Sequence, residues 1–464
     1  MAFYLKVYRE TSVHGRGFMS KSFKVITLGC KVNQYESAYL KSEFLKAGWV
    51  QAKREDKSDV SIVNTCVVTQ KAAHQSRQEI RKAVRLSPKG FNAAVGCYAQ
   101  VFPEELSKID GLDLVAGNTF KGEMPRLILE RTGDEKPAIL RKDFEAGMAF
   151  TILPVDHFAD RTRAHLKIQD GCESFCAYCV VPYARGPFRS LPSTNVLSAL
   201  ESLANKGYKE VVLTGIHLGK YGVDLKRGTN LTRLLEEIGK EAFPLRIRLS
   251  SLEPHELDRR LIELVASEKW LCRHFHIPLQ SGDPLVLRQM NRNYAPRDFA
   301  RRVTTIHERI PDVAIGVDIM AGFPGEDAAA HKNTCSLIED LPVSYLHVFP
   351  FSPRRGTLAS KYDGQNTAEV IKKRAADLRR IGQKKRTAFY RACLHKDFLV
   401  LVEGRQDNEE MVKGLADNYV PVLFEAPEPL RKDLIAVRIE RLVKNRVEGF
   451  ALDCPGSSLR FQGS

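Results

Sequence analysis

Three cysteines lie within eight positions of one another in the segment KIQDGCESFCAYCVVPYARG, residues 167–186. Cys172, Cys176 and Cys179 have the spacing C-x3-C-x2-C. Structural zinc sites use four ligands, often as two C-x2-C pairs, and c-type haem needs C-x-x-C-H; the segment has neither pattern. A cluster of four irons takes four cysteine ligands, so three cysteines would leave one iron with an open coordination position. An open position suits a cluster that binds a substrate.

A second set of cysteines follows a different pattern, between residue 23 and about residue 135. Cys30, Cys66 and Cys97 each come directly after a short apolar run and directly before a helix-like stretch. This alternation predicts a parallel sheet with helices on its faces, and ligands of such sheets bind at the carboxyl ends of the strands. We therefore expect the three thiols to share one metal site. The alternative is three separate buried cysteines, because free cysteine is among the most buried residue types.

Residues 160 to about 360 contain six further apolar runs, each followed by a polar loop with Gly or Pro. The runs are AHLKIQDGC, KEVVLTGIHLG, LRIRLSSLEP, RHFHIPLQSGD, AIGVDIMAGFPGE and SYLHVFPFSPRRGT. Helix-like stretches lie between them, so the pattern predicts an α/β barrel, complete or partial. Its chemistry should lie on the loops at the carboxyl ends of the strands. The three closely spaced cysteines follow the first of these strands.

The bulk composition limits the class of protein. The chain has 464 residues, a net charge of +15 and a hydrophobic fraction of 43%. The excess of positive charge favours a nucleic-acid partner, although many basic proteins are merely soluble. No apolar run approaches the length of a membrane span, and the first residues lack the apolar core of a secretory signal. We expect a cytoplasmic protein whose ten cysteines are metal ligands, redox thiols or core residues rather than disulfides.

The last part of the chain combines a basic segment with short apolar runs. Residues 372–391, KKRAADLRRIGQKKRTAFYR, carry nine Lys or Arg against one Asp and are compatible with a long helix. We expect an electrostatic track for phosphates, the alternative being a solvated helix face. The runs that follow, from DFLVLVEG to VEGFAL, predict a small antiparallel β-barrel.

The segment CESFCAYC, with Tyr178 before the last cysteine, resembles the radical S-adenosylmethionine enzymes. The resemblance implies that Cys172, Cys176 and Cys179 hold a [4Fe–4S] cluster whose open iron binds S-adenosylmethionine. It also implies a partial barrel of six strands as the fold. In that family, reductive cleavage gives a 5′-deoxyadenosyl radical, and an electron donor such as flavodoxin or ferredoxin supplies the electron. The cofactor thus provides chemistry that no side chain can, while the protein binds and orients it.

The first part of the chain resembles the methylthiotransferases, through TLGCKVNQYES, NTCVVTQKA and GCYAQ. The resemblance implies a second [4Fe–4S] cluster on Cys30, Cys66 and Cys97, which delivers sulfur taken from sulfide or polysulfide. S-adenosylmethionine would then have two roles, as methyl donor to the sulfur and as radical source. GCKVNQYES and TGIHLGKYG resemble the branch that modifies N6-threonylcarbamoyladenosine next to the anticodon of tRNA. KAAHQSR, residues 71–77, departs from the family forms, which tend to have an acidic residue near His74 and a lysine near Gln75.

The same resemblance suggests contacts for S-adenosylmethionine at the strand ends. The alternative for each residue is turn formation or capping, since Gly and Pro are ordinary in loops. The suggested residues are Tyr178, Thr214, Gly215, Ser250, Ser251, Glu253, Gln280 and Phe349, with Ser281, Asp318, Gly322, Pro324 and Phe351 around the same mouth.

The C-terminal part resembles a TRAM domain, an RNA-binding barrel, through GLADNYVPV with Asn418 and Tyr419. Tyr419 is predicted to stack on a base, the alternative being packing within the barrel. Lys384, Lys385 and Arg386 are predicted to contact RNA. The resulting division of the chain is an N-terminal extension (1–22), a methylthiotransferase domain (23–145), a radical S-adenosylmethionine barrel (155–390), a TRAM domain (394–454) and a tail (455–464), with Met19 as an alternative start.

Two other functions fit parts of the sequence. One is the same chemistry on a ribosomal-protein aspartate, against which the GCKVNQYES string argues. The other is a non-enzymatic RNA-binding protein with structural zinc, which the basic charge fits and the cysteine spacing does not. A zinc protein would be colourless, whereas an iron–sulfur protein would be brown.

Overall fold

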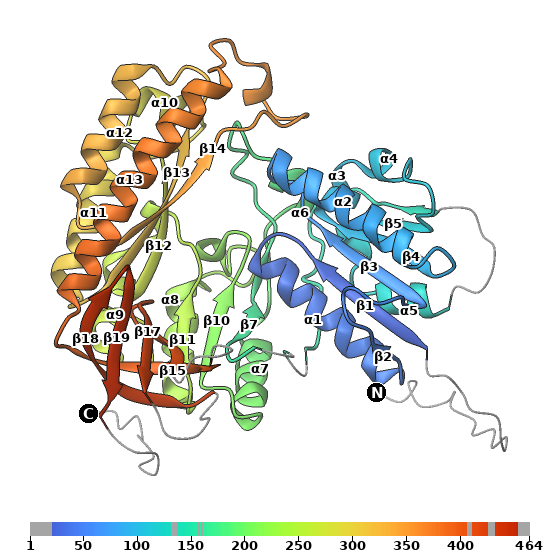
Figure 1. Cartoon of the computed structure of the whole chain (residues 1–464), viewed down its shortest axis with the longest axis horizontal. Coiled ribbons are helices and arrows are strands. Elements are labelled where there is room, and N and C mark those ends of the chain that lie inside the picture. Colours follow the sequence, from blue (N-terminus) through green and yellow to red (C-terminus); the bar gives the residue numbers. More distant parts are fainter. Residues whose placement is uncertain are drawn as a thin grey trace.

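The computed structural model describes residues 21–130, 138–155, 158, 161–405, 411–425 and 432–452. Within these ranges the chain forms three units, an N-terminal α/β unit, a central α/β unit and a C-terminal β-barrel (Figure 1). The proposed tail and nearly all of the N-terminal extension, including Met19, lie outside the described residues. The fold class predicted from the sequence is confirmed.

The N-terminal unit is a six-stranded sheet in which all neighbouring strands are parallel, in the order β2-β1-β3-β4-β5-β6. All six residues of β3 are buried, as expected for a central strand covered by helices on both faces. The four strands predicted from apolar runs are present, and the pattern missed β2 and β6, which are short edge strands. The elements are β1 (Ser22–Thr27), α1 (Lys31–Lys46), β2 (Val50–Gln51), β3 (Val60–Thr65), α2 (Gln70–Leu86), β4 (Phe91–Gly96), α3 (Cys97–Val101), α4 (Pro103–Leu106), β5 (Leu114–Ala116), η1 (Asn118–Phe120), α5 (Met124–Leu129) and β6 (Ala138–Leu140).

The central unit contains the six predicted barrel strands as two parallel three-stranded sheets, β7-β10-β11 and β12-β13-β14. Backbone hydrogen bonds from Cys272 N to Ile247 O and from Leu252 N to His276 O join the two sheets next to β11 and β12. The result is the predicted partial barrel. Its strands are β7 (Ala164–Lys167), β10 (Glu210–Thr214), β11 (Arg246–Leu249), β12 (His274–Gln280), β13 (Ala314–Ala321) and β14 (Tyr345–Pro350), and a two-stranded ribbon is formed by β8 (Gln169–Asp170) and β9 (Arg189–Ser190).

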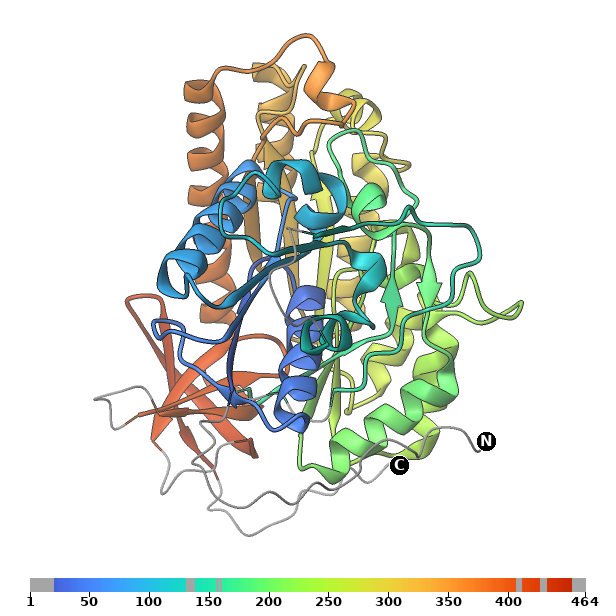
Figure 2. The same cartoon turned by 90° about the vertical axis from the view of Figure 1, so that its right-hand side faces the viewer.

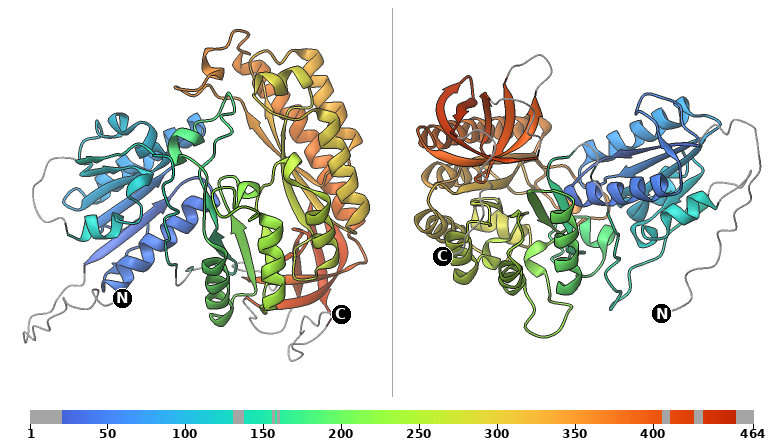
Figure 3. Two further views of the ribbon diagram at one scale, coloured as in Figure 1. Left: turned by 180° about the vertical axis from the view of Figure 1, so that it is seen from behind. Right: turned by 90° about the horizontal axis from the view of Figure 1, so that it is seen from below.

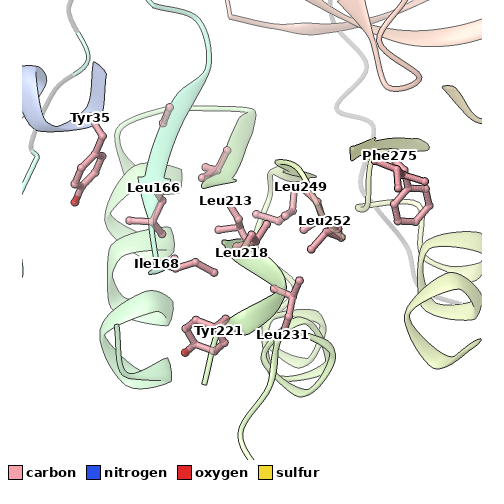
Figure 4. Packing of buried hydrophobic residues seen from close by; sticks show 14 of the residues in the cluster. Tyr35, Leu166, Ile168, Leu213, Leu218, Tyr221, Leu231, Leu249, Leu252 and Phe275 are labelled. Atoms are coloured by element: carbon pink, nitrogen blue, oxygen red, sulfur yellow. The ribbon is translucent and has the colours of Figure 1, made fainter. Parts of the chain in front are cut away.

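Helices cover the outer face of these strands. Leu166, Leu213 and Leu249 come from three neighbouring strands and share one apolar cluster with Leu231 of α8 (Figure 4). Because strand side chains alternate between faces, the residues next to these leucines lie on the inner face of the partial barrel. The helices are α6 (Val181–Arg185), α7 (Ser193–Asn205), α8 (Leu231–Glu241), α9 (Arg259–Ser267), α10 (Pro284–Gln289), α11 (Pro296–Arg309), α12 (Ala328–Asp340) and α13 (Ala368–Ala392), with short 3-10 turns η2 (Leu218–Lys220), η3 (Pro254–Glu256) and η4 (Ala359–Lys361).

The basic segment is the long helix α13, as predicted, and it runs beside β14 and α12 to the C-terminal barrel (Figure 1). Its buried side chains, including Leu378 and Ile381, hold it against the central unit. Gly382 allows this close approach, because a Cβ there would lie 3.1 Å from Cβ of Leu346. None of the helices in the described ranges is long and apolar enough to cross a membrane.

The C-terminal unit is a closed five-stranded barrel in the order β15-β16-β17-β19-β18. Four neighbouring pairs are antiparallel, as predicted, but β17 and β19 are parallel. The difference follows from the odd number of strands, since directions cannot alternate all the way around a ring of five. The strands are β15 (Asp397–Arg405), β16 (Val412–Ala416), β17 (Pro421–Glu425), β18 (Leu434–Val443) and β19 (Arg446–Ala451).

Both outer units lie against the central one (Figures 1 and 3), and Figure 2 shows the N-terminal unit in front of it. A buried ion cluster on the inner face of the partial barrel fixes the C-terminal barrel. Glu210 accepts hydrogen bonds from Arg246 at 2.7 Å and from Arg248 at 2.8 Å. The two guanidinium groups donate onward to the main-chain oxygens of Leu399, Leu415, Ala416 and Asp417 in the C-terminal barrel. Burial alone would raise the pKa of Glu210, but Arg248 and Arg246 hold it well below its ordinary value.

We predict that Glu210→Gln loosens the C-terminal barrel, because it leaves two buried guanidinium groups without a counter-charge. The loss in unfolding free energy should be about 3–5 kcal/mol, measured by guanidinium chloride titration, and limited proteolysis between α13 and β15 should speed up. The matched control is Glu263→Gln, which removes an exposed pair with Arg259. Equal behaviour of the two variants would contradict the assigned role of Glu210.

Candidate active site

The closely spaced cysteines lie in the loop between β8 and α6. The Sγ atom of Cys172 is 3.5 Å from Nδ1 of His217, and that of Cys176 is 3.5 Å from Nη1 of Arg292. The main-chain N–H of Val181 donates to Sγ of Cys179 at 3.4 Å. Burial, with the neighbouring thiols of Cys176 and Cys172, raises the pKa of the Cys179 thiol to about 12. The three thiols therefore share one loop beside His217 and Arg292, and their role as cluster ligands stays a prediction.

The backbone holds this loop tightly. Cys172 N donates to Gly186 O at 2.9 Å, and Ala177 N donates to Met290 O at 3.0 Å. Gly171 has φ +79°, and a Cβ there would lie 1.7 Å from Pro187 O. Only glycine fits this position, both because of its left-handed backbone and because of the close carbonyl.

The residues suggested for S-adenosylmethionine lie at the carboxyl ends of β10, β11 and β12 and on β14, except Tyr178, which belongs to the cysteine loop itself. The hydroxyl of Ser250 is buried there and has no hydrogen-bond partner among the described residues, so it is available to a ligand. Glu253 pairs with Arg292, and burial raises the pKa of the Glu253 carboxyl. Gln280 has a left-handed backbone, with φ +66°, at the end of its strand. Thr214 is buried at the end of β10, with Gly215 after it, whereas Ser251 is exposed.

The suggested aromatic residues divide into two kinds. Tyr178 is packed edge-on against Phe323, with ring centroids 6.4 Å apart, and Phe351 is buried in the same cluster. Phe351 is thus a core residue in this structure. Phe349, in contrast, is 42% exposed and lies on the same face of β14 as His347, with ring centroids 6.5 Å apart.

The second set of cysteines also converges. Cys30 precedes α1, Cys66 follows β3 and Cys97 begins α3, so each lies at the carboxyl end of a parallel strand. A Cβ at Gly29 would lie 3.0 Å from Sγ of Cys66, which shows how closely the loop of Cys30 approaches Cys66. Burial, with the thiols of Cys97 and Cys30 nearby, raises the pKa of the Cys66 thiol to about 12. All nine cysteines in the described residues are free thiols.

A buried network of charges connects the two sets. Glu36 of α1 accepts hydrogen bonds from Arg185 of α6 at 2.5 and 3.1 Å, and Arg185 also donates to Oδ1 of Asn33 at 2.6 Å. Two lysines also contact Glu36: Lys167 lies 3.5 Å from it, and Lys121 forms an ion pair with it. Sequence reasoning missed this network, because Glu36 and Arg185 stand in quoted motifs but nothing in one sequence shows that they meet.

Asn118 connects the two sets more directly. Its amide donates to Ala184 O at 2.6 Å and lies 3.6 Å from Sγ of Cys97. Ala184 belongs to α6, which begins two residues after Cys179. The two thiol sets therefore lie on either side of the junction between α3 and α6, in two different units of the chain.

The residues predicted to contact RNA have different surroundings. Lys384 and Arg386 are exposed on α13. Lys385 donates to Glu339 O at 2.6 Å and Leu341 O at 2.7 Å, so its ammonium group satisfies carbonyls at the end of α12. Tyr419 stacks on His274 of the central unit, with ring centroids 4.5 Å apart. It contributes to docking of the C-terminal barrel, and its contact with a base stays a prediction.

Comparisons with known proteins agree with this arrangement. Residues 22–117 match the model of the uncharacterized protein family UPF0004, and residues 166–338 match that of the radical SAM superfamily. The threonylcarbamoyladenosine tRNA methylthiotransferase MtaB of Aquifex aeolicus is 39% identical over 410 residues, which cover 88% of this chain and 97% of that protein. The chain belongs to the radical S-adenosylmethionine tRNA methylthiotransferases.

Other relatives extend this family assignment. The methylthiotransferase MtaB of Bacillus subtilis is 36% identical over 418 residues, covering 89% of this chain and 92% of that protein. The tRNA-2-methylthio-N(6)-dimethylallyladenosine synthase of Fusobacterium nucleatum is 33% identical, covering 90% and 97%. Among solved structures, the methyltransferase TsrM from Kitasatospora setae has a TM-score of 0.52 at 17% identity, covering 72% of this chain and 75% of that one. This last likeness shows a shared fold.

We predict that Gly171→Ala disrupts the cysteine loop of this methylthiotransferase. The matched control is Gly207→Ala, since Gly207 has φ +80° but no atom within 4 Å of its added Cβ. The control should lose only about 1–2 kcal/mol of unfolding free energy, which is the cost of alanine in a left-handed conformation. Gly171→Ala should lower the thermal unfolding midpoint further and reduce iron binding after anaerobic reconstitution. Equal midpoints and equal iron would show that the loop tolerates the clash.

Proposed function

We propose that this methylthiotransferase replaces the C2 hydrogen of N6-threonylcarbamoyladenosine by a methylthio group, at the adenosine next to the tRNA anticodon (position 37). The observation that supports it most is the pair of thiol triads, one from each α/β unit, on either side of one junction. The family relatives supply the substrate, because three enzymes named for threonylcarbamoyladenosine are 39%, 36% and 35% identical to this chain. These relatives act on tRNA by name, which favours this substrate over a ribosomal-protein aspartate.

The donor sets fit two iron–sulfur clusters. Three convergent thiols suit the soft metals and leave a cluster of four irons with one open position. We assign Cys172, Cys176 and Cys179 to the radical cluster and Cys30, Cys66 and Cys97 to the auxiliary cluster. When bound, the first would supply the 5′-deoxyadenosyl radical from S-adenosylmethionine, and the second would supply sulfur from sulfide or polysulfide together with a methyl group from a second S-adenosylmethionine.

The protein's own residues bind and orient S-adenosylmethionine. We assign binding of S-adenosylmethionine to the hydroxyl of Ser250 and the carboxylate of Glu253, together with Tyr178, Thr214, Gly215, Ser251, Gln280 and Phe349. Arg292 holds Glu253 in place through their ion pair.

We assign the other partners on charge and chemistry. The net charge of +15 suits the polyanionic tRNA, whose anticodon loop would reach the triads while α13 and the C-terminal barrel contact phosphates and bases. A reductant such as flavodoxin or ferredoxin would supply the electron. We keep 23–145, 155–390 and 394–454 as the functional division, and we place the protein in the cytoplasm with its tRNA substrate.

The direct test is a nucleoside mass spectrum. The protein is reconstituted without oxygen and given reductant, sulfide, S-adenosylmethionine and tRNA that carries threonylcarbamoyladenosine. We expect that nucleoside to gain the mass of SCH3 in place of H. Formation of 5′-deoxyadenosine without this product would overturn the substrate, and absence of both from protein holding both clusters would overturn the reaction.

We predict that Cys30→Ala separates the two activities. The variant should still cleave S-adenosylmethionine to 5′-deoxyadenosine, because the second triad is intact, but should form no methylthio product. The matched control is Cys335→Ala, which removes a thiol on α12 outside both triads. Normal methylthio product from Cys30→Ala would refute the auxiliary assignment.

We predict that the double variant Lys384→Gln/Arg386→Gln binds tRNA more weakly. Each lost phosphate contact should reduce the slope of log affinity against log salt by about 1. Filter binding at several salt concentrations measures both quantities. The control Lys226→Gln/Arg227→Gln removes the same charge from two exposed residues of the central unit. If the control weakens tRNA binding as much as the double variant does, α13 is not a specific phosphate-binding surface.

A further inference from the structure

Three side chains with metal-binding groups meet on the inner face of the partial barrel. They are His276 of β12, Asp318 of β13 and His347 of β14, from three adjacent strands. Asp318 and His347 are direct partners in the β13–β14 register. The neighbours Phe275 and Ile277 belong to the apolar cluster under the helices, so His276 faces the other way.

The distances are those of groups that could share one ion. Nε2 of His276 lies 2.7 Å from Oδ1 of Asp318, and Nδ1 of His347 lies 3.3 Å from the same oxygen. All three ligand atoms lie within 4.8 Å of one another. Ligands of a zinc-like ion lie about 2.0–2.2 Å from it, so small side-chain shifts would bring all three into range.

The carboxylate of Asp318 lies between the two imidazole rings. Oδ1 of Asp318 is buried, yet no neighbour among the described residues makes a hydrogen bond of acceptable geometry with it. Nε2 of His276 and Nδ1 of His347 both approach this oxygen as ion-pair partners. A carboxylate oxygen flanked by two imidazole nitrogens offers one ion three donor atoms from three adjacent strands.

The contact of His276 with Tyr345, on the side away from Asp318, also favours a metal site. Nδ1 of His276 lies 3.4 Å from the hydroxyl of Tyr345, which is 2.8 Å from Nε2 of His274. Metal-binding histidines usually bond through their second ring nitrogen to such a partner, which fixes the tautomer and leaves the first nitrogen free. Here the free nitrogen is the one that faces Asp318. The side chain of His347 is 52% exposed, so the site opens to solvent on one side.

We propose that His276, Asp318 and His347 bind a divalent transition-metal ion, such as Zn²⁺, with an open coordination position on the inner face of the partial barrel. Two imidazoles and one carboxylate with open positions form a known donor set for such ions. The site differs in chemistry from the thiol triads, because it offers nitrogen and oxygen instead of sulfur. It does not depend on the proposed function and would exist whatever the substrate.

The test uses the full-length protein with both thiol triads loaded with iron. The protein is incubated with zinc chloride and desalted, and zinc is counted by mass spectrometry. X-ray absorption at the zinc edge identifies the ligands. We expect about one zinc per chain, with nitrogen and oxygen ligands and no sulfur.

Three variants locate the ion. His347→Gln should lose the zinc while keeping iron content and circular dichroism, and Tyr345→Phe should weaken zinc binding about 10–100-fold through the lost outer contact. His307→Gln, which changes an exposed histidine on α11, should bind zinc like the wild type. No zinc in the wild type, sulfur among its ligands, or equal zinc in His347→Gln would each overturn the proposal.

Discussion

The buried contact between Glu36 and Arg185 is the interaction on which the arrangement of the site depends. Glu36 lies on α1, the helix that follows Cys30, and Arg185 ends α6, the helix that follows Cys179. A charge buried without a partner costs several kcal/mol, so this pair forms only when the two α/β units are docked in one way. With Asn118 bonded to Ala184 beside Cys97, the docking fixes how the two thiol triads face each other. The proposed function needs this, since it assigns the radical to one triad and the sulfur to the other.

The two faces of the partial barrel differ in polarity. Its outer face carries the apolar core under the helices, whereas its inner face carries Glu210, Arg246 and Arg248 near the start of the strands. These charges are satisfied by one another and by main-chain oxygens of the C-terminal barrel. The C-terminal barrel, which is predicted to bind RNA, therefore docks on charged side chains of the inner face of the partial barrel. The N-terminal and C-terminal units each dock on the central one through buried ions.

The sequence predicted features that arise from local pattern. Cys30, Cys66 and Cys97 were each placed at the end of a strand by the alternation of apolar runs and helices, and all six barrel strands were found in the same way. The sequence could not predict contacts between distant segments. Lys385 also caps a neighbouring helix, and Tyr419 also stacks on a histidine of another unit, while their contacts with RNA stay predictions. The parallel pair in the C-terminal barrel depends on ring closure, which no single strand displays.

The measurement that tests the central claim most directly is the ratio of methylthio nucleoside to 5′-deoxyadenosine formed by Glu36→Gln. The control is Glu43→Gln on the same helix, where Glu43 pairs with Lys46 at the surface. Both variants are reconstituted and checked for equal iron. If docking of the two triads couples radical to sulfur transfer, Glu36→Gln still makes 5′-deoxyadenosine but its ratio falls, while Glu43→Gln matches the wild type. An unchanged ratio in Glu36→Gln would contradict the account.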